Sequence, residues 1–255
     1  MSRVLIGALS AILLTVAGVS AQPSATEANL DRQANLIEKP HLRPNLPEAK
    51  ILALVTAKLQ PVLEKIYGTP FQFDLTGERD PDAYSYYGPH VYVSRGMVDF
   101  ADSREELTGV LCHEASHVLH HDGTRSDRAT QVYNNRVKAF INRAEKVTHN
   151  HFKKPIAEII SAGGTLATLH YSRSEEEAAD LSGATVCSES GSNPWGIVWM
   201  LRKLRGSSPS SRIAWFSDHP TDKARIAVLS KYLRRHAEFA TWSSDPTLAS
   251  TPLRR

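Results

Sequence analysis

Residues 103–121 read SREELTGVLCHEASHVLHH, and this stretch decides the fold. Ser103 is a good helix N-cap, and Glu106, three residues later, completes the pattern of a capping box. Asp122-Gly123 predicts the end of the helix, because glycine readily adopts the left-handed conformation that follows a last turn. The predicted helix carries apolar residues on one side, so we expect it to pack against a core: Leu107, Val110, Leu111, Val118 and Leu119.

The same predicted helix also carries two histidines and a glutamate. His113 and His117 are four residues apart, so they project from one helix face about one turn apart. Two imidazoles there can reach one zinc ion at about 2.0–2.1 Å, and Glu114 can take a proton from a water at that ion. A solvated helix face is the alternative. The apolar residues favour a packed helix, in which the histidines and the carboxylate need polar partners.

A second stretch, residues 172–180, reads SRSEEEAAD and predicts another helix with acidic residues in its first turn. Acidic charge is favourable there because the helix dipole is positive at that end. A catalytic zinc needs a third protein ligand and an open position for water. Glu176 could be that ligand, while Asp180, four residues on, orients a ligand histidine. We interpret Glu175 and Glu177 as an ordinary charged first turn, although three consecutive glutamates leave the choice of ligand open.

Together the two stretches resemble the gluzincin peptidases that include the CAAX prenyl endopeptidases, the HtpX-type and Oma-type proteases and small soluble periplasmic quality-control relatives. Their pattern S-R-x-x-E-x-x-A-D places the third zinc ligand at Glu176. The resemblance covers about Glu48 to Leu233. It implies one zinc ion per chain, bound by His113, His117 and Glu176, with Glu114 as the catalytic base and Asp180 as an orienting residue.

The rest of the chain predicts an α+β fold, mostly helical: a zincin-like metallopeptidase domain with a small antiparallel sheet. Phe71 to Leu75 alternates as a strand does, and Tyr84 to Tyr87 and His90 to Ser94 are expected to form a hairpin. The resemblance places the active-site edge strand at Asp82-Ala83-Tyr84-Ser85, and we expect the substrate strand to comprise Tyr84, Ser85, Tyr86 and Tyr87. Such an edge can bind an extended polypeptide substrate through main-chain hydrogen bonds.

Asp218-His219-Pro220 also resembles a segment of that family. His219 could act as a fourth zinc ligand that holds the enzyme inactive, or as a catalytic donor to the oxyanion of the reaction. The alternative is a plain helix boundary, with Asp218 as the cap and Pro220 at the first helical position.

Cys112 and Cys187 are the only cysteines. Cys187 lies seven residues after Asp180, on roughly the same helical face. If the two motif helices run antiparallel with Asp180 near His113, Cys187 lies near Cys112 and a disulfide becomes plausible. Two buried free thiols are the alternative.

The N-terminus predicts export. Arg3, an apolar run from Val4 to Val16 and the small residues Val19-Ser20-Ala21 form a signal-peptide pattern over residues 1–21, with cleavage before Gln22. An uncleaved anchor is the alternative, and peripheral membrane association stays open. We expect the mature protein in the periplasm or secreted. Residues 22–47 are predicted to be a flexible leader with one short helical piece near Asn29 to Ile37, residues 48–236 the metallopeptidase domain, and residues 237–255 a disordered tail.

The predicted function is therefore zinc-dependent endopeptidase activity on polypeptides, namely misfolded or exported envelope proteins. The formal net charge of +3 is too small and too evenly spread to favour nucleic acid as a partner. A chaperone-like module that binds unfolded or outer-membrane proteins, with a non-catalytic zinc, is the alternative. Glu114 favours the enzyme, because a structural zinc site needs no base.

Overall fold

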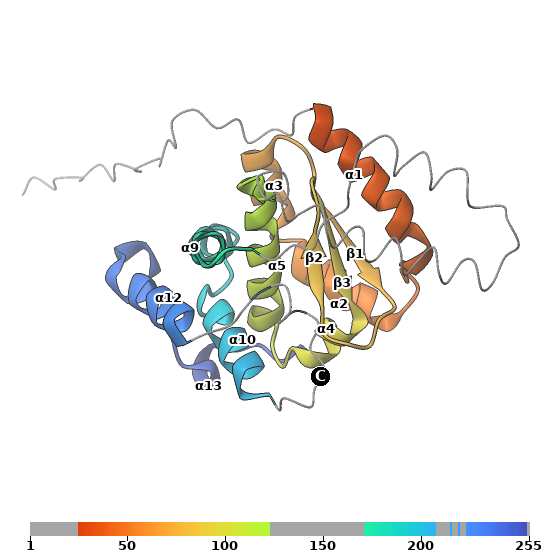
Figure 1. Cartoon of the computed structure of the whole chain (residues 1–255). Helices are drawn as coiled ribbons and strands as arrows, with labels where there is room; N and C mark the ends of the chain where they lie inside the picture. The colour runs from red at the N-terminus through yellow and green to blue at the C-terminus, as the bar shows by residue number, and fades with distance from the viewer. Residues whose placement is uncertain (1–24, 123–170, 208–214, 216–218, 220–222, 254–255) are drawn as a thin grey trace, which may run out of the picture.

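The computed structural model describes residues 25–122, 171–207, 215, 219 and 223–253, so the predicted signal peptide over residues 1–21 lies outside it (Figure 1). Within those ranges no helix has the length and apolar character needed to cross a membrane. The elements in chain order are α1 (Ala25–Glu38), η1 (Lys39–His41), α2 (Pro47–Thr56), α3 (Gln60–Tyr67), β1 (Gln72–Thr76), β2 (Ala83–Ser85), β3 (His90–Ser94), α4 (Arg95–Phe100), α5 (Arg104–Leu119), α9 (Arg173–Glu189), α10 (Trp195–Gly206), α12 (Lys223–Arg235), η2 (Ala237–Phe239) and α13 (Pro246–Ala249).

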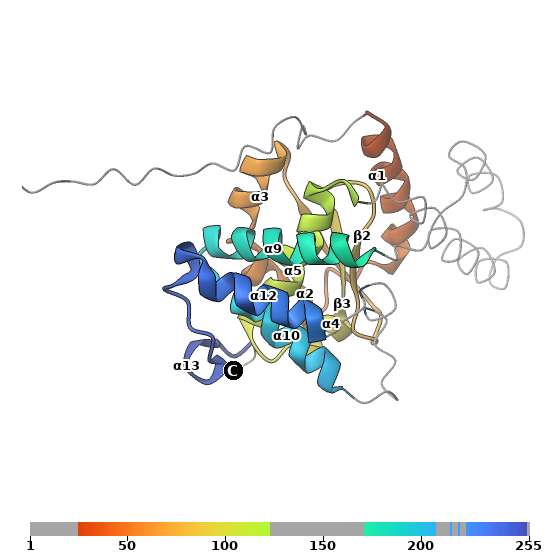
Figure 2. The same ribbon diagram turned by 60° about the vertical axis from the view of Figure 1, so that its left-hand side comes forward.

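Helix α5 is the central element, between the sheet on one side and α9 and α10 on the other (Figure 1). Figure 2 shows α9 crossing α5. The predicted cap is present, since the Ser103 hydroxyl accepts the Glu106 N–H at 3.1 Å. The Glu106 carboxylate accepts the N–H of Asp102 at 2.7 Å, the residue before the cap. These contacts fix where α5 begins and therefore where its histidines lie.

The sheet has three strands in the order β1-β3-β2. β2 and β3 form the predicted antiparallel hairpin, but β1 pairs with β3 in parallel, so the expectation of an antiparallel sheet is wrong and the sheet is mixed. The difference arises because β3 enters between the two earlier strands. Alternation along a strand shows which residues share a face, but it does not show the direction of the neighbouring strand.

The two faces of the sheet have different partners. Val91 and Val93 point into the apolar core, while Tyr84 and Tyr92, which pair across the two strands, point to the opposite face. Helix α1 covers that opposite face. The alternation along β2 therefore turns Ser85 toward α5 and the tyrosines toward α1.

Helix α1 corrects the prediction of a flexible leader over residues 22–47. Glu38, at the end of α1, accepts hydrogen bonds from the Tyr84 hydroxyl at 2.9 Å and from the Tyr86 hydroxyl at 2.6 Å. Asp31 lies 2.7 Å from Nδ1 of His90. Residues 25–47 are thus part of the folded unit, while residues 22–24 lie outside the described ranges.

The predicted disordered tail over residues 237–255 is also wrong for residues 237–253. Phe239 in η2 is buried, and the Arg104 N–H donates to the Thr251 carbonyl at 2.9 Å. The Trp199 indole N–H donates to the Ser244 carbonyl at 3.0 Å. The tail therefore packs against the start of α5 and against α10.

Two glycines let the helices approach α5 closely. A Cβ atom on Gly183 of α9 would lie 3.2 Å from main-chain atoms of Cys112 and His113, and one on Gly109 of α5 would lie 2.6 Å from the main-chain nitrogen of Ile197 in α10. Backbone meets backbone at both crossings, with no side chain between them. A disulfide between Cys112 and Cys187, with their Cα atoms 6.0 Å apart, also joins α5 to α9.

Candidate metal centre

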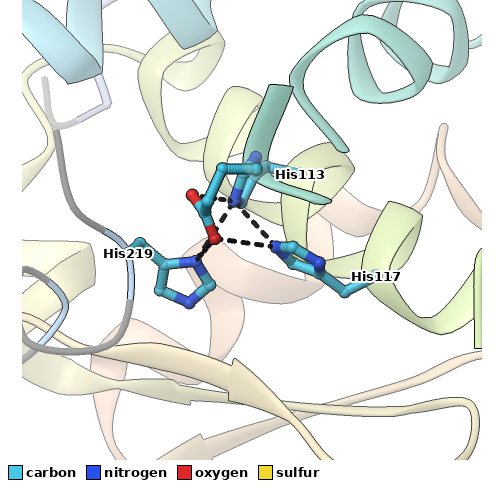
Figure 3. A group of neighbouring side chains, drawn as sticks. His113, His117 and His219 are labelled. Carbon is cyan, nitrogen blue, oxygen red and sulfur yellow. Dashed lines mark hydrogen bonds and ion pairs between the residues drawn. The ribbon is translucent and has the colours of Figure 1, made fainter. Parts of the chain in front are cut away.

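Four side chains bring one ligand atom each to a common point in the interior: His113, His117, Glu176 and His219. These atoms all lie within 4.8 Å of one another, and each residue is 1% exposed. The three histidine rings point toward one another (Figure 3). No other group of this kind occurs in the described part of the chain.

The distances within the group are short. Nε2 of His113 lies 3.1 Å from Nε2 of His117 and 3.3 Å from Nδ1 of His219. Oε1 of Glu176 lies 2.8 Å from Nδ1 of His219 and 3.4 Å from Nε2 of His117. Helix α5 supplies two of the four ligand atoms, the first turns of α9 supply the carboxylate, and His219 precedes α12.

A carboxylate orients each of the two α5 histidines. Asp180 lies 2.9 Å from Nδ1 of His113, and Asp122 lies 2.9 Å from Nδ1 of His117. Each carboxylate engages the outer ring nitrogen, so both Nε2 atoms face the common point. Asp180 was predicted to orient a ligand histidine, and the structure places it beside His113. Asp122 was not predicted, because Asp122-Gly123 was interpreted only as the end of the helix.

Arg225 of α12 ties the two acidic residues of α9 together. It donates to both Asp180 oxygens, each at 2.8 Å, and forms an ion pair with Glu176. Burial opposes ionisation of Asp180, but Arg225 and the contact with His113 hold its pKa below the ordinary value. Burial likewise opposes ionisation of Glu176, yet His219 and His117 hold its pKa well below the usual range. Both carboxylates are therefore charged in the interior.

The histidines differ in how readily they take a proton. Burial opposes the charged form of His117, but the contacts with Asp122 and Glu176 outweigh burial and raise its pKa to about 9. The pKa of His219 is also raised, because Glu114 and Glu176 outweigh burial, whereas burial dominates at His113 and lowers its pKa. A positive charge is thus favourable at the common point. Two imidazoles and a carboxylate are also a ligand set that suits zinc.

Glu114 lies beside this group and is fully buried. Its Oε1 accepts the Trp215 indole N–H at 2.9 Å and lies 3.4 Å from Nε2 of His219. Its Oε2 has no hydrogen-bond partner among the described residues. A buried carboxylate oxygen without a partner is unfavourable, so it fits a role that requires it to act on water. The contact with Trp215, which lies 101 residues further along the chain, was not predicted.

Tyr171 covers His117 of α5. Its ring stacks on His117, with centroids 3.6 Å apart and an angle of 7° between the planes. Burial raises the pKa of Tyr171 well above its ordinary value, so the hydroxyl keeps its proton. The contact of Tyr171 with His117 was not predicted. The sequence signal for it was the position of Tyr171 directly before the SRSEEEAAD stretch.

The predicted substrate strand lies beside α5. The Ser85 hydroxyl donates to the Glu114 carbonyl at 3.5 Å, which places β2 next to the residue that follows His113. Tyr84 and Tyr86 turn away to Glu38, and Tyr87, which follows β2, is half-buried. In the described ranges, no strand pairs with the outer edge of β2. The strand β2 therefore presents its main chain, more than its tyrosine side chains, beside the converging histidines.

The disulfide between Cys112 and Cys187, which the sequence made plausible, lies next to the converging group. Cys112 directly precedes His113 on α5, and Cys187 lies on α9, the helix that carries Glu176. The bond links the two helices that supply three of the four converging atoms.

A protein-family model for peptidase family M48 matches residues 50–233. The chain belongs to peptidase family M48. The match coincides with the region of the predicted resemblance, and membership of M48 indicates a metal-dependent peptidase. The M48 region contains every residue of the converging group, together with Glu114, Asp180 and Trp215.

Proteins similar to this M48 chain include three with related names. The beta-barrel assembly-enhancing protease of Escherichia coli O157:H7 is 26% identical over 168 residues, which cover 62% of this chain and 34% of that protein. The protein of the same name from Yersinia pestis is 27% identical over 166 residues, with the same coverage of 62% and 34%. A putative beta-barrel assembly-enhancing protease of Vibrio cholerae is 28% identical over 128 residues, 48% of this chain and 26% of that protein. The chain spans about a third of the length of these relatives, or less.

Proposed function

We propose that this protein is a zinc-dependent metalloendopeptidase. The observation that carries the proposal is the convergence of ligand atoms from His113, His117 and Glu176 within 4.8 Å of one another, beside Oε2 of Glu114, which has no hydrogen-bond partner among the described residues. A zinc ion at this point would polarise a scissile carbonyl and lower the pKa of a neighbouring water toward neutrality.

The residues of the chain have separate tasks. His113, His117 and Glu176 would hold the ion, and Asp180 and Asp122 keep the two imidazoles turned toward it. Oε2 of Glu114 takes the proton of the attacking water. The same oxygen then returns the proton to the leaving amine as the peptide bond breaks. Burial of all these groups excludes bulk water and strengthens their electrostatic effects.

His219 is proposed as the fourth ligand of a latent form. A catalytic zinc keeps one position open, whereas four protein atoms fill a tetrahedral shell. Nδ1 of His219 lies 2.8 Å from Glu176 and 3.3 Å from His113, which supports a position inside the shell. His219→Ala would then raise peptidase activity. If His219 instead donates to the oxyanion, the same change lowers kcat by about 10²–10³-fold.

The proposed substrates are misfolded or exported polypeptides of the cell envelope. The edge of β2 supports this, because main-chain pairing accepts many sequences. The names of the relatives, beta-barrel assembly-enhancing proteases, support an envelope setting. The disulfide between Cys112 and Cys187 supports an oxidising compartment, the periplasm or the outside of the cell.

Glu114→Gln is the experiment that tests the proposed function. We expect the variant to bind about one zinc per chain and to lose cleavage of a reduced, unfolded test protein, since it lacks a base. Glu177→Gln is the matched control, because it makes the same change at a half-buried position near the ligands and should leave cleavage unchanged. Retained cleavage in Glu114→Gln contradicts the mechanism. A zinc-loaded wild-type chain that binds the unfolded protein without cutting it would instead support the chaperone-like alternative.

A further inference from the structure

Trp215 contacts Glu114 and two rings of the converging group, those of His219 and His113, and the His113 ring centroid lies 5.6 Å from that of the indole. Its indole N–H donates to Oε1 of Glu114 at 2.9 Å, and its ring stacks on His219 with centroids 4.6 Å apart and planes 17° apart. The side chain is buried. A tryptophan in the interior commonly has one polar partner, but here that partner is the proposed base.

The local backbone explains the stacking. The His219 N–H donates to the Trp215 carbonyl at 2.9 Å, a contact between residues four apart that corresponds to one helical turn. Side chains at this spacing lie on the same face of a turn. The same short piece of chain therefore carries both His219 and the indole that covers it.

We propose that Trp215 is a positioning residue that sets which oxygen of Glu114 acts as the base. The inference rests on the proposed function. Oε1 is held by the indole N–H and by its proximity to Nε2 of His219, 3.4 Å away, while Oε2 is left without a partner among the described residues. A carboxylate held at one oxygen cannot rotate freely, so the other oxygen keeps a fixed direction. Trp215 makes no hydrogen bond to the four converging atoms. In this proposal it does not touch the substrate either.

Trp215→Phe removes the N–H and keeps an apolar ring. We expect kcat to fall about 10–100-fold, the usual effect of losing an orienting partner, while KM and zinc content stay close to wild type. Trp199→Phe is the matched control, because Trp199 is also buried and also donates one indole hydrogen bond, to the Ser244 carbonyl. It should leave kcat unchanged. A merely structural role for Trp215 would reduce zinc content or folded yield in step with activity, and that result overturns the proposal.

A second measurement does not depend on activity. The indole N–H resonances of zinc-free protein are recorded by nuclear magnetic resonance and assigned with the two Phe variants. In Glu114→Gln, the Trp215 resonance should move and the Trp199 resonance should not, because a charged acceptor has been replaced by a neutral one. An unmoved Trp215 resonance overturns the inference whether or not the protein is a peptidase. If the resonance moves but wild-type protein cleaves nothing, the contact stands and the proposed function fails.

Discussion

Nε2 of His113 lies 3.1 Å from Nε2 of His117, and both rings are buried. Two imidazole nitrogens at this distance repel through their lone pairs unless a proton or a cation lies between them. Glu176 adds a negative charge on the same side. The pair is therefore a position at which protons and a metal ion compete, and the first three predictions follow from that competition.

Zinc should stabilise the folded chain. Free zinc at about 100 times its Kd raises the free energy of unfolding by about 2.7 kcal/mol, because the ligands converge only in the folded state. His113→Ala should abolish this effect, measured as the change in urea midpoint on chelation. His236→Ala, at an exposed position, should keep it. Equal zinc content in His113→Ala and wild type would contradict the ligand assignment.

Zinc binding should release protons at neutral pH. The pKa of His117 is raised to about 9, so the zinc-free chain holds a proton there at pH 7.5 that the ion must displace. Apparent zinc affinity should therefore rise with pH up to about 9. Calorimetry at pH 7.5 in buffers of different ionisation enthalpy measures the release. Asp122→Asn removes a group that raises this pKa, so fewer protons should be released, and an unchanged number would contradict the prediction.

The raised pKa of His117 should also make the zinc-free chain less stable as pH rises. The folded pKa of His117 exceeds its ordinary value of 6.5. The stabilisation from its charged form is therefore fully present below pH 6.5 and is lost as pH rises toward 9. Urea unfolding of chelated protein should show this loss in wild type and less of it in Asp122→Asn. Equal pH dependence in the two proteins would show that the ion pair contributes nothing.

Asp180→Asn should weaken zinc binding about 10–100-fold, because it removes the charge that orients His113 and faces Arg225. A competition assay with a chromogenic chelator measures the affinity. Asp99→Asn is the control: Asp99 forms a more exposed ion pair with Arg95, at 3.9 Å, and its replacement should leave the zinc affinity unchanged. If Asp180→Asn bound zinc as tightly as the control variant, the proposed orienting role of Asp180 would be wrong.

The disulfide should contribute substantially to stability. Cys112 and Cys187 are 75 residues apart in sequence, and closing a loop of that size stabilises by about 4 kcal/mol in the chain-entropy model. The double variant Cys112→Ala/Cys187→Ala should unfold at lower urea than oxidised wild type, and reductant should move wild type toward the variant. If reductant also shifts the variant, the bond is not the cause.

The contribution of α1 can be tested at Glu38. Glu38→Gln should lower the free energy of unfolding by about 1–3 kcal/mol, since two buried tyrosine hydroxyls lose a charged acceptor. Glu64→Gln, at an exposed position, should have little effect. A flexible segment would give the same result for both variants, which would contradict the packing of α1.

Local spacing carried most of what the sequence could predict. The four-residue spacing of the α5 histidines, and of Glu176 and Asp180, depends only on helix geometry, and the structure brings these residues together. The direction of β1 depends on which strand enters beside it, which no local pattern encodes.

The missed contacts share a different cause. Glu38 holds α1 through hydrogen bonds from Tyr84 and Tyr86, and Asp31 holds it through His90 of β3. Such polar contacts leave no apolar periodicity in the sequence. Trp215 meets Glu114 across 101 residues. A single residue at such a separation has no partner spacing to reveal it, so only the folded chain could show that Glu114 has an indole beside it.

The glycine crossings at Gly183 and Gly109 determine how well the centre can tolerate sequence change. Main-chain atoms have no rotamers, so the position of His113 relative to α9 and α10 is set by peptide geometry and not by how neighbouring side chains fill space. Apolar residues elsewhere around α5 can exchange size with one another and be accommodated by side-chain rotation. A methyl group at either glycine would instead push the helices apart, so these two small residues fix how closely α9 and α10 approach the helix that carries His113 and His117.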